Sequence, residues 1–182
     1  DLAARPAAFK PQEISNSIWA FSTVGFGYDE ACGTNSHNDY VHAATDDPRG
    51  DGALVHAALE VVAEDALTRL DGFKAQELNN MVWGFARLGH RTERSAQLFS
   101  GVARQLVQRT WQFKPQELGA TLWSFATAEF FDPDAFIAGA SRLNARHIRG
   151  FKPQEMSNTL WALATAGVAP RHVHAFDTSL VP

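Results

Sequence analysis

Cysteine is almost absent from this sequence, since Cys32 is the single one in 182 residues. One thiol excludes an internal disulfide framework and a cysteine-based zinc site. Long apolar runs are missing too, because none approaches the roughly 18–20 residues needed to span a bilayer. The chain also lacks a phosphate loop and the motifs HExxH, GxSxG and paired cysteines. Nothing positive indicates an enzyme, a cofactor or a metal ion, and we expect none of them.

An excess of basic charge is missing as well. The chain has 16 Lys and Arg against 20 Asp and Glu, for a net charge of -4. Residues 1–72 carry 4 basic and 12 acidic side chains, and residues 73–182 carry 12 and 8, which gives balances of -8 and +4. The total argues against general nucleic-acid binding, whereas the second part could still meet an anionic partner. With 45% apolar residues, the chain can bury a core of one-domain size.

What the sequence does contain is an internal repeat. Four segments align without gaps: FKPQEISNSIWAFSTVGF from Phe9, FKAQELNNMVWGFARLGH from Phe73, FKPQELGATLWSFATAEF from Phe113 and FKPQEMSNTLWALATAGV from Phe151. The last two spacings are 40 and 38 residues, and the first is 64. The extra residues predict an inserted polar loop at about 28–52. Its Cys32, His37 and His42 match no standard metal-ligand spacing.

Each segment has the pattern of a helix with a defined start. Proline fits the first helical position in three copies, and Glu13, Glu77, Glu117 and Glu155 fit the third, where a carboxylate can accept the cap N–H. A Phe before the cap and an apolar residue at the fourth position form a hydrophobic staple. Apolar residues then recur with helical spacing, as at Ile14, Ile18, Phe21 and Val24. Gly25, Gly89 and Gly167 fall at the helix end, where the third copy has Glu129 instead.

The segments between these blocks also predict helices, at 53–70, 92–107 and 133–148. Each period is then a hairpin of two helices, A and B, which can bury its apolar face only against neighbouring hairpins. We therefore expect an all-α fold, an α-solenoid of about four helical hairpins in one domain, 1–182. The fourth unit stops inside its B segment, and the opening DLAARPAAFK has neither a starting Met nor a signal peptide. We expect a piece of a longer chain.

Lysine occupies the apparent N-cap of every unit, at Lys10, Lys74, Lys114 and Lys152. Ser, Thr, Asp and Asn are preferred there because their side chains accept a backbone N–H, and Lys cannot. An ammonium group beside the unpaired N–H groups of a helix start suits a phosphate. A row of four could follow an extended single-stranded backbone. The alternative is that each Lys is an exposed residue whose stem covers the staple Phe.

Amide and hydroxyl side chains form a second candidate row. Gln12, Gln76, Gln116 and Gln154 lie in the first helical turn, and SN, NN, GA and SN follow at 15–16, 79–80, 119–120 and 157–158. Such groups can read the edges of unpaired bases, which makes Ser15, Asn79 and Ser157 further candidates. The alternative is that the Asn at 16, 80 and 158 packs against the next helix, while small residues allow close approach.

Tryptophan recurs at one position as well, at Trp19, Trp83, Trp123 and Trp161. These rings could stack bases, but packing between repeats is the favoured interpretation. The arginines that follow the A helices (Arg87, Arg91, Arg94, Arg104, Arg109, Arg142, Arg146, Arg149 and Arg171) are typical of solvated helix faces. His90 and His147 are isolated, and we expect surface or cap residues there.

The blocks PQELNNMVWGFARLGH and PQEMSNTLWALATAG closely resemble the octotricopeptide repeat of algal organelle proteins, a two-helix unit with the core PQ-x-L-x-N-x-x-W-A-x-A-x-x-G. Related repeats occur in FAST-kinase-like and RAP-domain proteins. The resemblance covers almost the whole chain apart from the insertion. The chain departs from the pattern at Ala75, at Gly119 with Ala120, and at Glu129.

This resemblance implies an RNA-binding protein imported into chloroplasts or mitochondria, where such proteins support RNA stability, processing, splicing or translation. It implies single-stranded RNA as the partner, together with proteins of an organellar ribonucleoprotein complex. A protein-binding scaffold, or a subunit of a larger organellar assembly such as a ribosome, is the second hypothesis. The net charge, the acidic first unit and the small number of repeats favour that scaffold.

Overall fold

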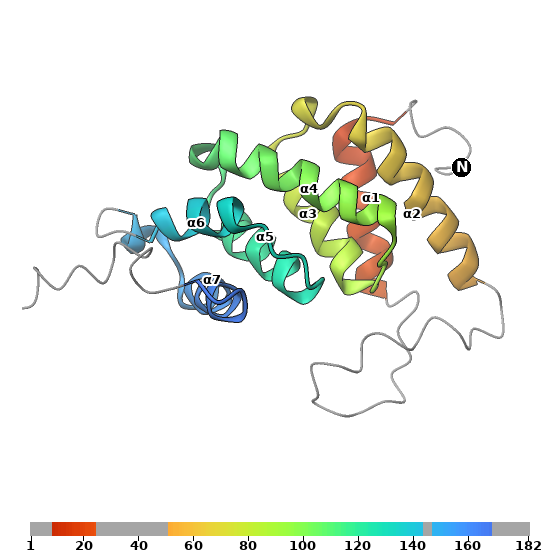
Figure 1. Cartoon of the computed structure of the whole chain (residues 1–182). Helices are drawn as coiled ribbons and strands as arrows, with labels where there is room; N and C mark the ends of the chain where they lie inside the picture. Colours follow the sequence, from red (N-terminus) through yellow and green to blue (C-terminus); the bar gives the residue numbers. More distant parts are fainter. Residues whose placement is uncertain (1–8, 25–50, 144–146, 169–182) are drawn as a thin grey trace, which may run out of the picture.

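The computed structural model describes residues 9–24, 51–143 and 147–168. These ranges contain seven α-helices and no strand, which confirms the prediction of an all-α fold (Figure 1). The helices are α1 (Pro11–Val24), α2 (Asp51–Leu67), α3 (Ala75–Arg87), α4 (Glu93–Gln108), α5 (Pro115–Thr127), α6 (Pro133–Ser141) and α7 (Pro153–Thr165). None of these described helices is both long and apolar enough to cross a membrane. The insertion predicted at 28–52 lies outside the described residues except for its last two, which begin α2.

The helices pack as two rows. Helices α1, α3, α5 and α7 contact one another in that order, and so do α2, α4 and α6. Each helix of the first row also contacts the helix that follows it in the chain, up to α6. Figure 1 shows the pairs succeeding one another across the molecule in chain order. We call the first row the A helices and the second row the B helices. The B partner expected for α7 lies outside the described residues.

Each A helix runs in the same general direction as its neighbour in the row. Early in both helices, the Thr121 hydroxyl of α5 donates to Asn79 Oδ1 of α3 over 3.3 Å. At the opposite ends, Arg87 Nε of α3 donates to the Ser22 carbonyl of α1 over 2.9 Å. A Cβ on Gly119, early in α5, would stand 2.9 Å from a backbone oxygen in the first turn of α7. The amino ends of all four A helices therefore lie along one edge of the molecule.

The predicted helix starts are confirmed. The Glu at the third helical position accepts the backbone N–H of the N-cap Lys, with N–O distances of 2.9 Å for Lys10 and 2.8 Å for Lys74, Lys114 and Lys152. This bond is one half of a capping box. The other half is missing because no Lys side chain accepts a hydrogen bond, so N–H groups of the first turn stay available to another partner.

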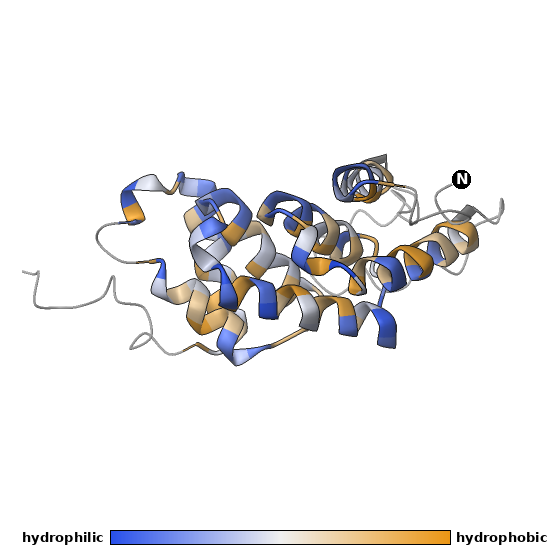
Figure 2. Cartoon of the chain, turned by 90° about the horizontal axis from the view of Figure 1, so that it is seen from above, coloured by the Kyte–Doolittle hydropathy of each residue, from blue (hydrophilic) through white to orange (hydrophobic). Residues whose placement is uncertain are grey.

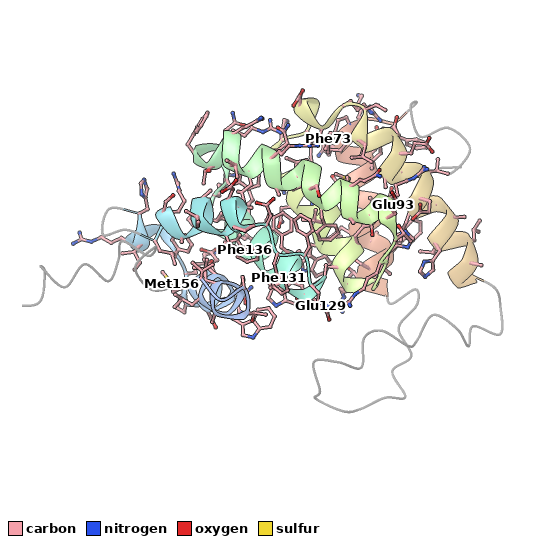
Figure 3. The ribbon with its side chains drawn as sticks, in the orientation of Figure 1. Phe73, Glu93, Glu129, Phe131, Phe136 and Met156 are labelled. Atoms are coloured by element: carbon pink, nitrogen blue, oxygen red, sulfur yellow. The ribbon has the colours of Figure 1, made fainter. Side chains whose placement is uncertain are left out.

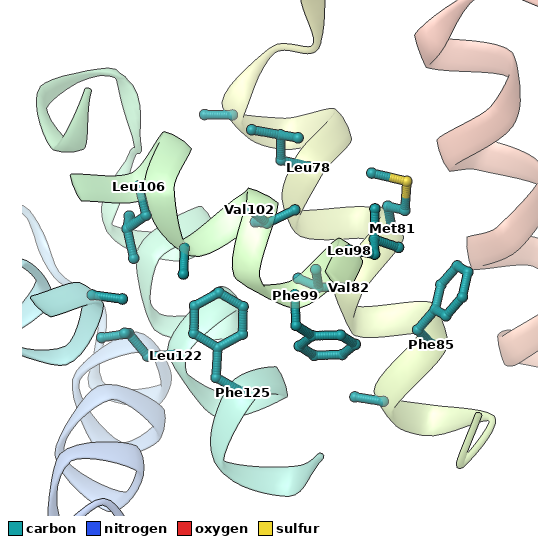
Figure 4. Close-up of a cluster of buried hydrophobic side chains, with 14 of the residues drawn as sticks. Leu78, Met81, Val82, Phe85, Leu98, Phe99, Val102, Leu106, Leu122 and Phe125 are labelled. Atoms are coloured by element: carbon teal, nitrogen blue, oxygen red, sulfur yellow. The ribbon is translucent and has the colours of Figure 1, made fainter. Parts of the chain in front are cut away.

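The apolar positions of the helical period form the core. Ile14, Ile18 and Phe85 are completely buried, and the staple Phe73 and Phe113 are each 1% exposed. Figure 4 shows the side chains that meet where α3, α4 and α5 come together. Hydrophilic and hydrophobic residues alternate along the helices rather than forming blocks (Figure 2), as expected when each helix has one buried side. Burial of such large side chains, at about 1.5–3 kcal/mol each, stabilises the two rows.

Two features of the connections differ from the sequence prediction. Helix α6 ends at Ser141 rather than at 148, because the Leu143 N–H turns back to the Ala140 carbonyl over 2.9 Å. Short 3₁₀ helices, η3 (Leu70–Gly72), η4 (Thr110–Gln112) and η5 (Ile148–Gly150), precede the staple Phe of α3, α5 and α7. A three-residue helix is too short to leave a periodic pattern in the sequence.

The third unit keeps the repeat's turn although it lacks the glycine. Gly89 and Gly167 follow their A helices with φ values of 63° and 68°, and Glu129 adopts the same left-handed conformation with a φ of 57°. Figure 3 shows Glu129 at the end of α5. The replacement of the repeat's glycine by Glu129 therefore leaves the local geometry unchanged. It raises the free energy of this conformation, because a Cβ crowds the following carbonyl.

Glu129→Gly is expected to raise the free energy of unfolding by about 0.5–1 kcal/mol, because glycine adopts a positive φ without steric cost. Thermal unfolding followed by circular dichroism measures the change. Glu129→Ala is the matched control, since it removes the exposed 3.2 Å ion pair with Arg91 and keeps the Cβ. Equal gains in the free energy of unfolding for Glu129→Gly and Glu129→Ala would show that loss of the ion pair, and not relief of the backbone conformation, causes the change.

Candidate nucleic-acid interface

The four N-cap lysines lie exposed along the edge where the A helices begin. In the described part of the chain, none of their side chains takes part in an ion pair. We call Lys10, Lys74, Lys114 and Lys152 the lysine edge. A cation with no carboxylate partner keeps its charge available for an anion, which is the first requirement of a phosphate contact.

Carboxylates lie beneath the lysine edge, and they limit its charge. Glu77 and Glu117 are each 8% exposed and point inward to the backbone N–H of the Lys that precedes them by three residues. Each helix start therefore combines one exposed ammonium group with one carboxylate that is already hydrogen-bonded. The edge presents separate cationic points rather than a continuous basic surface.

The glutamines of the first turn are exposed on all four A helices. They follow the lysines by two residues, so Gln12, Gln76, Gln116 and Gln154 lie next to the lysine edge. The Gln154 amide donates to Asn158 Oδ1 over 3.0 Å, which fixes the orientation of both amides on α7. The structure therefore brings the predicted lysine and glutamine rows together on one side of the molecule.

Of the other predicted base-reading residues, Ser15 and Asn79 are buried and only Ser157 is exposed. Ser15 is completely buried, and its hydroxyl donates to the Gln12 carbonyl over 3.1 Å. Asn79 is 9% exposed and accepts the hydrogen bond from Thr121. Their repeat position faces the next A helix, so Ser15 and Asn79 belong to helix packing. Ser157 is exposed at the same position because no A helix follows α7 within the described residues.

The tryptophans fit the expectation of packing only in part, since Trp161 packs against the core and Trp19 is largely exposed. Trp19 is 47% exposed, and Trp83, Trp123 and Trp161 keep part of their surface in solvent. The guanidinium carbon of Arg87 lies 5.3 Å from the ring centroid of Trp83, within the range of a cation–π interaction. These rings therefore border the core and do not form its centre.

Two arginines join successive units, and the sequence analysis missed this role. Arg109 Nη2 donates to the Phe73 carbonyl over 2.8 Å, and Arg69 Nη2 donates to the Phe9 carbonyl over 3.1 Å. Both precede a staple Phe by four residues and reach the staple Phe of the unit before. That shared spacing in RLDGF and RTWQF is the sequence signal that could have identified them.

Three of the other described arginines, Arg87, Arg91 and Arg94, are also engaged within the protein. Arg91 Nη2 donates to the Thr127 carbonyl over 3.1 Å, and Arg94 pairs with Glu60 and Glu64. Arg91 reaches the carboxyl end of α5, whereas Arg94 of α4 pairs with α2 within the row of B helices. These contacts make Arg91 and Arg94 structural rather than available to a partner.

His90 is buried, at 3% exposed, where the sequence analysis expected a surface or cap residue. Its Nδ1 lies 2.8 Å from His56 Nδ1 and its Nε2 lies 2.6 Å from Glu60 Oε1. Burial lowers the pKa of His90 and the neighbouring His56 adds to this, while Glu60 opposes both. Burial raises the pKa of Glu60, but hydrogen bonds from Thr92 and His90 and the nearby cations outweigh it, so that pKa is lowered. The described residues include no cluster of three or more His, Cys, Asp or Glu side chains suited to a metal ion.

Comparison with known proteins gives no relative from which a role could be transferred. No protein-family model matches the chain, and a search of curated proteins finds no match either. The candidate interface therefore depends on the geometry described above and on the repeat motif.

Arg109→Ala is expected to lower the free energy of unfolding by about 1–3 kcal/mol, because it leaves the Phe73 and Leu70 carbonyls without a charged donor. Urea denaturation measures the loss. Arg104→Ala is the control, since Arg104 is exposed on α4 and forms no ion pair within the described ranges. Its effect should stay within about 0.5 kcal/mol. Equal losses in the two variants would contradict the role of Arg109 in joining units.

His90 should also make stability depend on pH. Its pKa in the folded protein lies below the ordinary histidine value of 6.5, so the unfolded chain binds this proton more readily. The contribution of His90 is therefore fully present above pH 6.5 and decreases as the pH falls below that value. We expect urea unfolding at about pH 7.5 and pH 5.5 to show a larger loss for the wild type than for His90→Asn. Identical losses would exclude His90 as the source.

Proposed function

We propose that the chain is an α-solenoid of about four helical hairpins that binds single-stranded RNA along the lysine edge. The observation that carries this proposal is the parallel packing of the A helices, which gathers four exposed, unpaired lysines at one edge. A helix start offers N–H groups and the positive end of the helix dipole, which favour a phosphate beside each ammonium group. Lysines would hold phosphates, and the adjacent glutamines would contact bases.

The resemblance to octotricopeptide repeats supports a role in organellar RNA metabolism, such as RNA stability, processing or translation, in a chloroplast or mitochondrion. The proposed action is binding rather than catalysis and needs no cofactor. Of the hydroxyl and amide candidates, Ser157 remains at the surface with the glutamines, and we leave Ser15 and Asn79 out of the proposed contact set because they are buried.

A protein-binding scaffold is the second candidate, and exposed apolar side chains favour it. Trp111 is 69% exposed, Phe131 48% and Leu160 39%. Leu160 lies on α7, the last A helix that is described, where a neighbouring unit or another protein could cover it. The buried carboxylates under the lysine edge also lower the attraction for a polyanion. The two candidates differ in their dependence on salt, because phosphate contacts release counterions and apolar contacts do not.

Lys74→Ala combined with Lys114→Ala is expected to weaken the binding of a single-stranded RNA oligomer by about tenfold or more. The slope of log affinity against log salt should also decrease, by about 0.7 for each lost phosphate contact. Fluorescence anisotropy titrations at several salt concentrations measure both quantities. Thermal unfolding should be almost unchanged, because both side chains are exposed and unpaired.

The matched control is Arg91→Ala combined with Arg94→Ala, which removes the same charge away from the lysine edge. That control should retain most of the RNA affinity. Equal losses in the two double variants would mean that only net charge matters. A wild-type protein that does not bind RNA at low salt would rule out the proposed function and favour the scaffold.

A further inference from the structure

Each A helix keeps the same four repeat positions at least partly exposed. On α1 these are Gln12, Asn16, Trp19 and Thr23, whose spacings of four, three and four residues keep them on one helix face. None of the side chains at these positions on α1, α3, α5 and α7 is buried, whereas Ile14 on another face of α1 is 0% exposed. We call the four equivalent faces together the outer stripe.

A tryptophan stands in every part of the outer stripe. Because the A helices are parallel and pack in order, the rings of Trp19, Trp83, Trp123 and Trp161 follow one another across the molecule. Their spacing is set by helix packing, at roughly 8–10 Å. Folding normally removes much of an indole ring from water. Trp19 keeps 47% of its surface in solvent and the other three keep a smaller part, so all four rings remain partly accessible at one repeat position.

The outer stripe contains no carboxylate, although the chain carries 20 Asp and Glu and a net charge of -4. Its accessible polar groups are the Gln and Asn amides, the hydroxyls of Thr23 and Thr165 and the guanidinium of Arg87, whereas the Thr127 hydroxyl is buried. The lysine edge adjoins it, because the Gln of each unit follows the Lys by two residues. A polyanion on the lysine edge could therefore lay its bases over the outer stripe without meeting an acidic side chain there.

We propose that the outer stripe is a base-stacking platform on which Trp19, Trp83, Trp123 and Trp161 stack unpaired bases of RNA held by the lysine edge. This inference rests on the proposed function and names its base-contacting side. Stacking on an aromatic ring strengthens binding by roughly tenfold for each base and tolerates any sequence. Bases in a double helix are already stacked and paired, so the platform requires a single strand.

The units of the platform also differ in the hydrogen bonds that they can offer to a base. One helical turn before each Trp, the outer stripe carries Asn16, Asn80 or Asn158, and the third unit has Ala120 instead. An amide can both donate to and accept from a base edge, whereas the Ala methyl can do neither. The base over Trp123 is therefore held by stacking with the least help from hydrogen bonds.

The test compares two RNA probes in fluorescence anisotropy titrations: single-stranded oligouridine, and an abasic oligoribonucleotide of the same length that has phosphates but no bases. Trp123→Leu combined with Trp161→Leu should weaken oligouridine binding by about tenfold or more. The same variant should bind the abasic strand as the wild type does, with an unchanged salt slope. Trp111→Leu is the matched control, since Trp111 is 69% exposed on η4 and outside the outer stripe, and it should bind both probes normally.

Substitution by Phe guards against a change in the fold. Trp123→Phe combined with Trp161→Phe keeps an aromatic face at both positions and should retain most of the oligouridine affinity that the Leu variant loses. Wild-type-like thermal unfolding of the Phe variant together with weak oligouridine binding would overturn the platform, because it would show that ring stacking is not what the indoles supply.

The remaining outcomes separate the platform from the proposed function. If the Leu variant binds oligouridine like the wild type while the lysine variants bind weakly, the RNA function stands and the platform is overturned. Equal weakening toward both probes would also overturn it, because the tryptophans would then act on the backbone. If the wild type binds neither probe, the proposed function fails and the platform fails with it. The platform also fails if the Leu variant binds both RNA probes normally and loses binding only to a protein partner.

Discussion

Parallel packing of one A helix on the next is the constraint on which the rest of the structure depends. A single pair of helices leaves apolar side chains on two sides, and only neighbouring pairs can cover them. Phe85 and Phe125 occupy the same repeat position and are both completely buried. Gly119 allows α7 to approach α5 so closely that a Cβ would meet its backbone. Because each A helix packs on the one before it, the direction of each follows from that of its neighbour.

A consequence is that the two edges of the A row carry different kinds of charge. At the amino ends, the capping carboxylates turn inward to backbone N–H groups and leave the ammonium groups outside. At the carboxyl ends, Arg91 pairs with Glu129, and in the row of B helices Arg94 of α4 pairs with Glu60 and Glu64 of α2. The formal charge of -4 describes neither edge. What an anionic partner would meet depends on which cations are already paired, and the lysine edge holds unpaired ones.

Polar contacts between distant residues fix how the units are oriented within this arrangement. Arg109 and Arg69 each tie the end of one unit to the staple carbonyl of the unit before. His90 joins the turn after α3 to His56 and Glu60 on α2, so it connects the A row to the B row. His90 is buried and the two arginines are partly buried, and their hydrogen bonds depend more on exact geometry than apolar contacts do. They hold the spacing between units that the lysine edge and the outer stripe share.

The sequence by itself determined the helix starts, the staples, the helical period and hence the all-α class, because each depends on residues within about four positions of one another. It also identified the lysine and glutamine rows, since repetition alone marks them. Only the tertiary structure decided that Ser15 and Asn79 are buried, that Arg109 joins two units, that His90 is enclosed and that the tryptophans keep part of their rings in solvent. The physical reason is distance along the chain: the groups that bury His90 or bond Arg109 come from positions about thirty or more residues away. A local pattern shows which face a residue occupies but not what covers that face.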